Sequence, residues 1–194
     1  PWSEWAKKNI LKEFPELKRK IEVVYPGIPL PKLKKKKKTK DIQILFIGRD
    51  FEMKGGRIVI NVLDRLTKKY QNVKGMIISD IPKEILEKYK DNKKIKFLRL
   101  MSQKKLFEEI YPNSDIFLYP TFSDTMGFAI LEAQSFGLPV IAQKTGSTHT
   151  IEETIKENET GFVINNGKTD GYFRKFNERI IKKFVGKCEK LIKD

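Results

Sequence analysis

The feature that most restricts how this chain can fold is a regular alternation of short apolar runs and amphipathic segments from Asp41 onward. The runs that we expect to form buried strands are 42–48, 73–79, 95–100, 115–119, 139–142 and 162–164. Helical spacing of apolar residues predicts helices at about 56–70, 82–90, 102–111, 127–136 and 150–157, with a long helix at the C-terminal end. This alternation predicts an α/β fold with a doubly wound, mostly parallel sheet.

Three regions of the chain differ in composition. Residues 1–30 are expected to form a connecting helix and strand, 31–40 a lysine-rich loop, and 41–194 one well-cored domain. The loop contains five consecutive lysines at 34–38, whose mutual repulsion favours an extended, hydrated segment. Because the chain begins without Met, we expect it to be part of a longer protein with a further domain before residue 1.

The connector contains both helical and extended signals. Ser3 is a suitable N-cap for a helix that reaches about residue 20, and a strand is expected at 21–25 before a Pro-Gly turn. We expect Trp2 and Trp5 to pack on the domain or on a missing part of a longer protein. Contact of these aromatic side chains with a membrane surface is the alternative.

The net charge of +15 raises the possibility of a polyanionic partner. The basic excess lies at the two ends: residues 1–40 hold 13 Lys and Arg against 4 Asp and Glu, and residues 165–194 hold 9 against 4. The region between them is almost balanced, so the ends have the character of solvated segments and we expect no nucleic-acid partner. A polyanion-binding module built on the lysine run stays an alternative.

The single cysteine, Cys188, allows no intrachain disulfide and favours a reducing compartment. No apolar run reaches the roughly 18 to 20 residues of a membrane-spanning helix, and no signal peptide is recognisable. We therefore expect a cytoplasmic protein. Peripheral association of the full-length protein with a membrane surface stays open.

A first loop with candidate functional residues follows the strand expected at 42–48. Arg49 comes directly after Gly48 at the end of this strand, Lys54 follows five residues later, and Gly55 helps to open the next helix. The carboxyl ends of parallel strands meet at one edge of a sheet, where ligands bind. A forked guanidinium and an ammonium beside a helix N-terminus suit a diphosphate.

The second loop follows the strand expected at 115–119. Asp124 lies just before a predicted helix, and Glu132 lies eight positions later, about two turns into that helix. The backbone N–H groups of Gly127, Phe128 and Ala129 are expected to point at an anion in front of the helix. Since apolar residues flank Glu132, we expect its carboxylate to be partly buried and to need hydrogen-bond partners.

Several familiar motifs are missing from the sequence. There is no D-x-D carrier of a catalytic divalent metal, and His149 is the only histidine, so we expect no metal site. Neither a G-x-G-x-x-G after a strand nor a P-loop occurs, which argues against dinucleotide-dependent redox chemistry and nucleoside triphosphate hydrolysis. We expect no cofactor.

Taken together, the motifs resemble a known family. Asp124-x7-Glu132 and its tail LEAQSFGLPVIA resemble the E-x7-E region of retaining GT-B glycosyltransferases, most closely glycosyltransferase family 4, which is similar to glycogen synthase in its donor domain. FIGRDFEMKGG at 46–56 resembles that family's VGR…KG segment, and VVYPGIP at 23–29 resembles the turn between its two halves. The resemblance covers about 21–165. It departs at Asp124, where Glu is usual, and at His149, which replaces a Glu in an ungapped match.

The resemblance implies a Rossmann-like domain, the C-terminal half of a GT-B enzyme that binds a nucleotide-diphosphate sugar, UDP- or GDP-linked, without a metal. The missing N-terminal domain would hold the acceptor, and the sugar would be transferred with retention. Arg49, Lys54 and Asp124 would be catalytic. The donor-binding residues would be Gly48, Gly55, Leu98, Arg99, Gly127, Phe128, Ala129 and Glu132. A nucleotide-sugar 2-epimerase of the same architecture is the alternative enzyme class.

Overall fold

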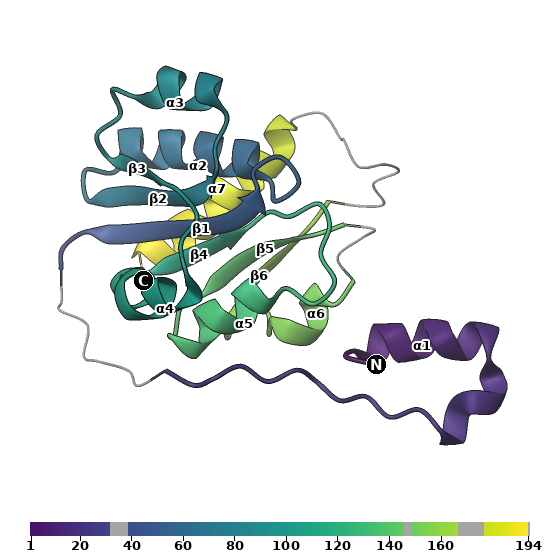
Figure 1. The fold of residues 1–194 in the computed structure, drawn as a ribbon. Helices are drawn as coiled ribbons and strands as arrows, with labels where there is room; N and C mark the ends of the chain where they lie inside the picture. Colours follow the sequence, from purple (N-terminus) through teal and green to yellow (C-terminus); the bar gives the residue numbers. More distant parts are fainter. Residues whose placement is uncertain (32–38, 146–148, 167–176, 194) are drawn as a thin grey trace.

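The computed structural model describes residues 1–31, 39–145, 149–166 and 177–193 (Figure 1). Six parallel strands form one sheet in the order β3-β2-β1-β4-β5-β6. The strands are β1 Ile42–Asp50, β2 Val73–Asp80, β3 Ile95–Leu98, β4 Ile116–Tyr119, β5 Val140–Lys144 and β6 Gly161–Asn165. The predicted doubly wound parallel fold is confirmed, with a strand at each of the six positions expected after Asp41.

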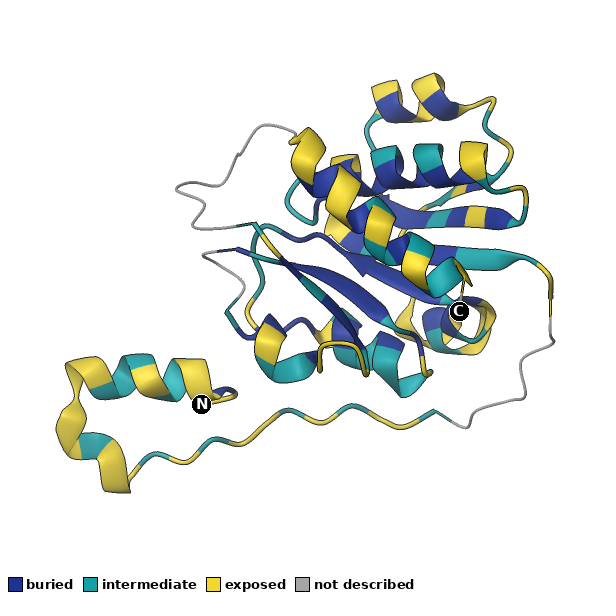
Figure 2. Cartoon of the chain, turned by 180° about the vertical axis from the view of Figure 1, so that it is seen from behind, coloured by how far each residue is buried: buried dark blue, intermediate teal, exposed yellow. Residues whose placement is uncertain are grey.

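Helices cover both faces of this sheet (Figures 1 and 2). On one face lie α2 (Gly56–Lys69), α3 (Lys83–Tyr89) and α7 (Glu178–Lys193), which contribute to the same apolar cluster. The other face is covered by the helical segment 103–113, α5 (Phe128–Ser135) and α6 (Ile151–Thr154). The helices fall at the predicted places in the chain.

The core is divided between the two faces by the two-residue period of the strands. In β1, Ile44 and Phe46 pack with the α2 and α7 cluster, whereas Leu45 between them packs with the α5 cluster, and all three are fully buried. β4 repeats this alternation, with Leu118 on the first side and Phe117 on the second. Strands buried on both faces explain why their sequences read as continuous apolar runs.

The strand order has its switch point between β1 and β4. From β1 the chain continues outward through β2 to β3, and it then returns to β4 on the other side of β1 and continues to β6. At such a topological switch point, the loops that leave the carboxyl ends of the two central strands diverge to opposite faces and leave room for a ligand. The loops after β1 and β4 are those in which the sequence places its candidate residues.

The helix predicted at 102–111 differs from expectation in its form. Only α4 (Gln103–Lys105) is α-helical; η2 (Leu106–Ile110) is a π-helix and η3 (Tyr111–Asn113) is a 3₁₀ turn. Pro112 has no N–H for an α-helical hydrogen bond, so the chain tightens at this point. The fully buried Tyr111 side chain packs against Phe107 and Phe136, which also contact each other.

The predicted strand at 21–25 is wrong for the described structure, where this segment is extended but belongs to no sheet. The side chain of Val24 is 66% exposed, and its N–H donates to the carbonyl of Pro1 instead of to a neighbouring strand. An apolar sequence forms a β-strand only where another strand offers a hydrogen-bonding edge. The two edge strands of the described sheet, β3 and β6, do not pair with 21–25.

The N-terminal segment instead docks through helix α1 (Glu4–Glu13), which lies beside α6 (Figure 1). Ser3 caps α1 as predicted, since its hydroxyl accepts a hydrogen bond from the N–H of Ala6. The Glu153 carboxylate on α6 accepts from the backbone N–H groups of Glu4 and Trp5 at 2.8 and 2.9 Å. This contact satisfies two amides that an isolated helix would leave open.

Two aromatic contacts add to this docking. Trp2 meets Phe128 of α5 edge-on at 5.9 Å between ring centroids, and Trp5 stacks on His149 at 4.6 Å. The expectation that these indoles pack on the domain is therefore confirmed.

Replacing Glu153 by alanine should release the N-terminal segment. The amides of Glu4 and Trp5 are expected to exchange with solvent about tenfold faster, because a helix cap contributes roughly 1 to 2 kcal/mol. Amides of the central sheet should keep their protection, as hydrogen exchange followed by mass spectrometry would show. Glu159→Ala is the matched control, since Glu159 lies only near Lys156. Unchanged exchange at Glu4 and Trp5 would mean that α1 is held by other contacts.

Candidate active site at the ends of β1 and β4

Two glycines allow the loops after β1 and β4 to approach each other. A Cβ atom on Gly48 would lie 2.6 Å from the Cβ of Lys54, so the lysine stem lies directly over the Gly48 backbone. Gly55 has φ +78°, and a Cβ there would lie 2.1 Å from the carbonyl oxygen of Pro120. Both positions therefore bring Lys54 against the loop that follows β4.

Lys54 and Asp124 form the centre of the site. The Lys54 ammonium lies 2.6 Å from Oδ2 of Asp124 and donates to the carbonyl of Ser123 at 3.0 Å. Tyr119, the last residue of β4, donates its hydroxyl to the same Oδ2. Oδ1 accepts the backbone N–H groups of Thr125 and Gly127 at 2.8 and 3.2 Å. Four donors thus occupy the carboxylate, about as many as it can accept.

This arrangement corrects one expectation about the helix N-terminus. The N–H of Gly127 is not free for an anion, because it already donates to Asp124. Gly127 is the N-cap of α5 in the left-handed region, with φ +71°, and Phe128 and Ala129 form the first helical turn. Amides in a first turn have no partner inside the helix, and an anion in front of those of Phe128 and Ala129 stays a prediction.

The environment of Asp124 determines its ionisation. Burial by itself raises the pKa of the carboxyl, but the hydrogen bonds from Lys54 and Tyr119, the Lys54 charge and the Gly127 amide outweigh it and leave the pKa below its ordinary value. Burial, and then the Asp124 charge, raises the pKa of the Tyr119 hydroxyl. At neutral pH Asp124 is therefore a carboxylate and Tyr119 a neutral phenol.

The lowered pKa of Asp124 predicts how stability depends on pH. A carboxyl group with a lower pKa in the folded state contributes stability above its unfolded pKa and loses that contribution as pH falls through the folded pKa. The free energy of unfolding should therefore fall below about pH 4, and it should fall less in Asp124→Asn. Urea titrations between pH 7 and pH 2.5 would measure both slopes. Asp91→Asn, at an exposed carboxylate, should keep the wild-type slope; an equal slope in Asp124→Asn would contradict the assignment.

Glu132 has the partly buried position and the partners that its apolar neighbours predict. Its carboxylate accepts the Tyr111 hydroxyl at 2.8 Å and the Gln103 amide at 2.6 Å. Burial, and then the Glu132 charge, raises the pKa of Tyr111, which remains a neutral donor. Because Gln103 belongs to α4, this hydrogen bond joins the segment after β3 to helix α5. Glu132 is thereby held at the same edge of the sheet as Asp124.

The remaining predicted residues also lie at this edge of the sheet, but they make fewer polar contacts. Arg49 is exposed at the end of β1 and makes no ion pair with any described residue. Leu98 ends β3 and packs on the core, whereas Arg99 is exposed in the loop that leads to α4. Ser79, near the end of β2, is the one buried side chain among the described residues whose hydroxyl has no hydrogen-bond partner. Such a group is usually completed by a ligand or water.

Three side chains of the site are absent from the sequence-based interpretation: Tyr119, Tyr111 and Gln103. Tyr119 is the last residue of a strand that the sequence does predict, so its side chain was expected only to fill the core. A tyrosine at the carboxyl end of a central parallel strand can direct its hydroxyl into the crevice, which is the signal that could identify it. For Tyr111 and Gln103 no comparable signal exists, because their contacts with Glu132 depend on how the segment 103–113 packs against α5.

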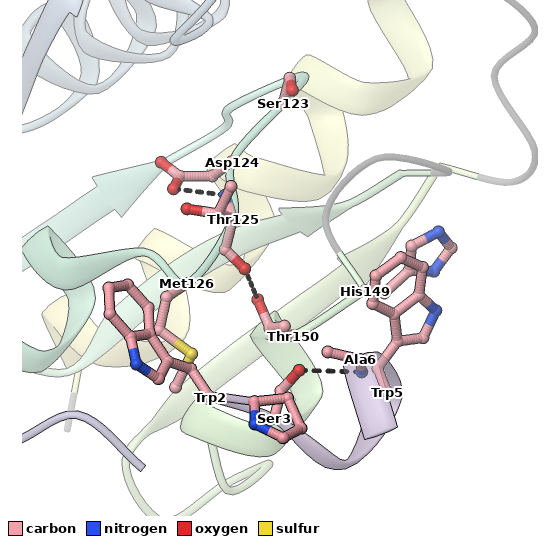
Figure 3. Close-up of a pocket in the computed structure, with 11 residues that line it drawn as sticks. Trp2, Ser3, Trp5, Ala6, Ser123, Asp124, Thr125, Met126, His149 and Thr150 are labelled. Carbon is pink, nitrogen blue, oxygen red and sulfur yellow. Dashed lines mark hydrogen bonds between the residues drawn. The ribbon is translucent and has the colours of Figure 1, made fainter. Parts of the chain in front are cut away.

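Next to Asp124 lies a cavity of about 780 Å³ between the N-terminal segment and the loops after β4 and β5 (Figure 3). Its lining includes Trp2 and Trp5 of the N-terminal segment together with Thr125, Met126 and Thr150. His149, stacked on Trp5, belongs to this cavity and has no contact with Lys54 or Glu132. Most of the surface of this cavity is apolar.

Two features are absent from the described residues. No set of three or more His, Cys, Asp or Glu side chains in this part of the chain is arranged to hold a metal ion. Within the same residues, no helix combines the length and the apolar character needed to cross a membrane.

Relatives and solved structures agree with this architecture. Sulfoquinovosyl transferase SQD2 of Arabidopsis thaliana is 29% identical over 150 residues, which are 75% of this chain and 28% of that protein. A glycosyltransferase from Rickettsia africae superimposes with a TM-score of 0.74 at 21% identity, over 99% of this chain and 52% of that one. The pneumococcal O-GlcNAc transferase GtfA, solved with UDP and GlcNAc, gives 0.72 at 16% identity, over 98% of this chain and 37% of GtfA.

The structural likeness shows the fold: an α/β, Rossmann-like domain of the kind found in GT-B glycosyltransferases. The sequence profile described as glycosyl transferases group 1 matches residues 31–194, which is most of the chain. The chain spans only about a quarter to two fifths of the length of its curated relatives. On the strength of the matched region, this protein belongs to the glycosyl transferases group 1 family.

Proposed function

We propose that residues 41–194 form the nucleotide-sugar donor site of a glycosyltransferase that transfers a sugar with retention and without a catalytic metal. The observation that carries the proposal is the Lys54–Asp124–Tyr119 cluster at the switch point of the sheet, with the amides of α5 beside it. The matched family consists of glycosyl transferases, and the relative SQD2 is a sulfoquinovosyl transferase. The structural neighbour GtfA was solved with UDP. The crevice between β1 and β4 is where ligands bind in this class of sheet.

In this proposal Lys54 holds the diphosphate. An ammonium has three N–H donors, and two of those on Lys54 are used by Asp124 and Ser123. The third is available to a phosphate oxygen, next to the first-turn amides of Phe128 and Ala129. Arg49, exposed at the end of β1, can reach the same anion with a second positive charge.

The same groups supply the chemistry. As the bond between the anomeric carbon and the diphosphate stretches, negative charge collects on the leaving phosphate oxygen. Fixed positive groups that face this oxygen stabilise the transition state more than the ground state. Lys54 is fixed by two hydrogen bonds, so it needs little reorganisation during the reaction. Lys54, Arg49 and the helix amides can together provide the charge for which other glycosyltransferases use a metal.

We assign the nucleoside end to Glu132. Its carboxylate is oriented by the buried Tyr111 hydroxyl and by Gln103 at the protein surface. A ribose diol can replace Gln103 as the donor while Tyr111 keeps the carboxylate in place. The base would then lie near Leu98 and Arg99, since the hydrogen bond from Gln103 brings that loop next to Glu132.

Residues 1–30 are proposed to connect this domain to an acceptor-binding half. Their apolar strand-like segment 21–25 finds no partner strand in the described sheet. A second α/β half that adds this segment to its own sheet would supply one.

Calorimetric titration with UDP, GDP and ADP, first in magnesium and then in excess chelator, tests the proposal. We expect one nucleotide to bind selectively and equally in both buffers. Glu132→Gln should weaken binding about tenfold, because it removes a charged acceptor of two hydroxyls. Glu108→Gln, at an exposed position on η2, is the control. No binding of any nucleotide, or binding that requires magnesium, would overturn the proposal.

A further inference from the structure

The cavity is lined by Asp124 but by none of the residues assigned to the diphosphate or the nucleoside. Trp2 and Trp5 of the N-terminal segment form one part of its lining, and Ser123, Thr125 and Met126 of the loop after β4 form another. Figure 3 shows the two indoles on either side of Thr150. Lys54, Arg49 and Glu132 do not line the cavity, so a ligand inside it would lie beyond Asp124 as seen from the phosphate position.

The charge of the lining restricts what can bind. The chain carries 40 Lys and Arg residues, yet none of them is among the described residues that line this cavity, where His149 is the one basic side chain. Asp124 also lines the cavity, and its charge is paired with Lys54. An anionic ligand would therefore lose its hydration beside a carboxylate and without a Lys or Arg partner. The lining is that of a site for an uncharged molecule.

The polar groups of the lining suit hydroxyls. Thr150 donates its hydroxyl to the carbonyl of Thr125 at 2.8 Å. The side-chain hydroxyls of Ser123 and Thr125 make no hydrogen bond within the described part of the chain, so they can accept from or donate to a ligand. Trp2 and Trp5 are 57% and 42% exposed, which leaves indole surface available beside these hydroxyls. Broad aromatic faces with a few polar groups are typical of small-molecule sites.

We infer that this cavity binds an uncharged sugar ring of the acceptor between Trp2 and Trp5, with the C–H groups of the ring against exposed indole surface. Pyranose rings combine an apolar face with a rim of hydroxyls, which matches the combination of indole faces and free hydroxyls in the lining. The inference rests on the proposed glycosyl transfer, because it places the acceptor next to Asp124. It makes residues 2–5 part of the binding site as well as of the connector.

The chain provides its own reporter for this site. Trp2 and Trp5 are its only tryptophans, and both line the cavity, so intrinsic fluorescence at tryptophan wavelengths comes from this site alone. We expect a saturable fluorescence change on titration with a panel of neutral methyl pyranosides at millimolar concentrations, without any nucleotide. At least one member should bind at least about tenfold more tightly than its uronic acid counterpart.

Substitutions of the two tryptophans test whether the sugar that changes the fluorescence binds at the indoles. Trp5→Ala should weaken binding of the best methyl pyranoside about tenfold, with Trp2 as the remaining reporter, whereas Trp5→Phe should stay within about threefold. Trp2→Ala should also weaken it, with Trp5 as reporter. Phe14→Ala is the control, because Phe14 is 53% exposed on the same segment but lies outside the cavity. Hydrogen exchange at Glu4 establishes that α1 stays docked in each variant.

Two results would overturn the inference: no saturable response to any neutral pyranoside, or equal affinity in Trp5→Ala while α1 stays docked. Tighter binding of the uronic acids would also contradict the argument from charge. The glycoside titration contains no nucleotide, and the nucleotide titration contains no glycoside. Failure of the sugar site therefore leaves the nucleotide result unchanged, and the two hypotheses are tested separately.

Discussion

Replacing Lys54 by methionine is expected to reduce nucleotide-diphosphate affinity by about 30- to 100-fold, since a charge-assisted hydrogen bond contributes roughly 2 to 3 kcal/mol. Methionine keeps an unbranched stem over Gly48 and removes only the ammonium. In a full-length enzyme the loss of turnover should be larger, about 10² to 10³, because leaving-group charge is greatest in the transition state. Calorimetry on this chain measures the first quantity.

The same variant should be less stable. Without the ammonium, the half-buried carboxylate of Asp124 keeps Tyr119 and two amides but loses its countercharge. We expect about 1 to 3 kcal/mol of destabilisation in urea, and part of it should return in Lys54→Met/Asp124→Asn while nucleotide affinity stays low.

Lys74→Met is the matched control for this experiment. Lys74 pairs with Asp41 at the opposite, amino-terminal end of the sheet, and both side chains are exposed. An exposed ion pair contributes at most about 1 kcal/mol, and this one is far from the crevice, so binding should be unchanged. Normal nucleotide affinity in Lys54→Met would remove the main support for the donor site.

The second large effect is expected from Gly55→Ala. Alanine at φ +78° costs about 1 to 2 kcal/mol, and its Cβ would lie 2.1 Å from the Pro120 carbonyl oxygen, which is backbone and cannot rotate away. Separation of the two loops should add about 1 to 3 kcal/mol, as overpacking does, and should disrupt the Lys54–Asp124 contact. Chemical denaturation would measure the loss of stability, and calorimetry the accompanying loss of nucleotide binding.

Gly186→Ala is a control for which we expect the opposite change in stability. Gly186 is exposed within α7, and nothing lies within 4 Å of a Cβ added there. Alanine in a helix interior is more favourable than glycine by roughly 0.5 to 1 kcal/mol, so this variant should gain stability. If Gly55→Ala were as stable as Gly186→Ala, the close approach of the two loops would not be required.

Many residues of the candidate site could be predicted from the sequence because they follow predicted strands. Arg49 and Lys54 lie after β1, and Asp124 and Glu132 lie after β4, so a parallel sheet brings them to one edge. The partial burial of Glu132 followed in the same way from its apolar neighbours, and its hydrogen bonds with Tyr111 and Gln103 confirm it. Which side-chain groups meet at that edge could not be predicted.

The sequence by itself determined the order and type of the elements from Asp41 onward, because apolar periodicity depends on residues close together in the chain. Only the tertiary structure decided the pairing of Lys54 with Asp124, which are 70 residues apart. It also decided that the N–H of Gly127 donates to Asp124, that 21–25 forms no strand, and that Trp2 and Trp5 line a cavity. Each of these depends on side-chain direction or on an available hydrogen-bonding edge, and both are set by segments distant in the sequence.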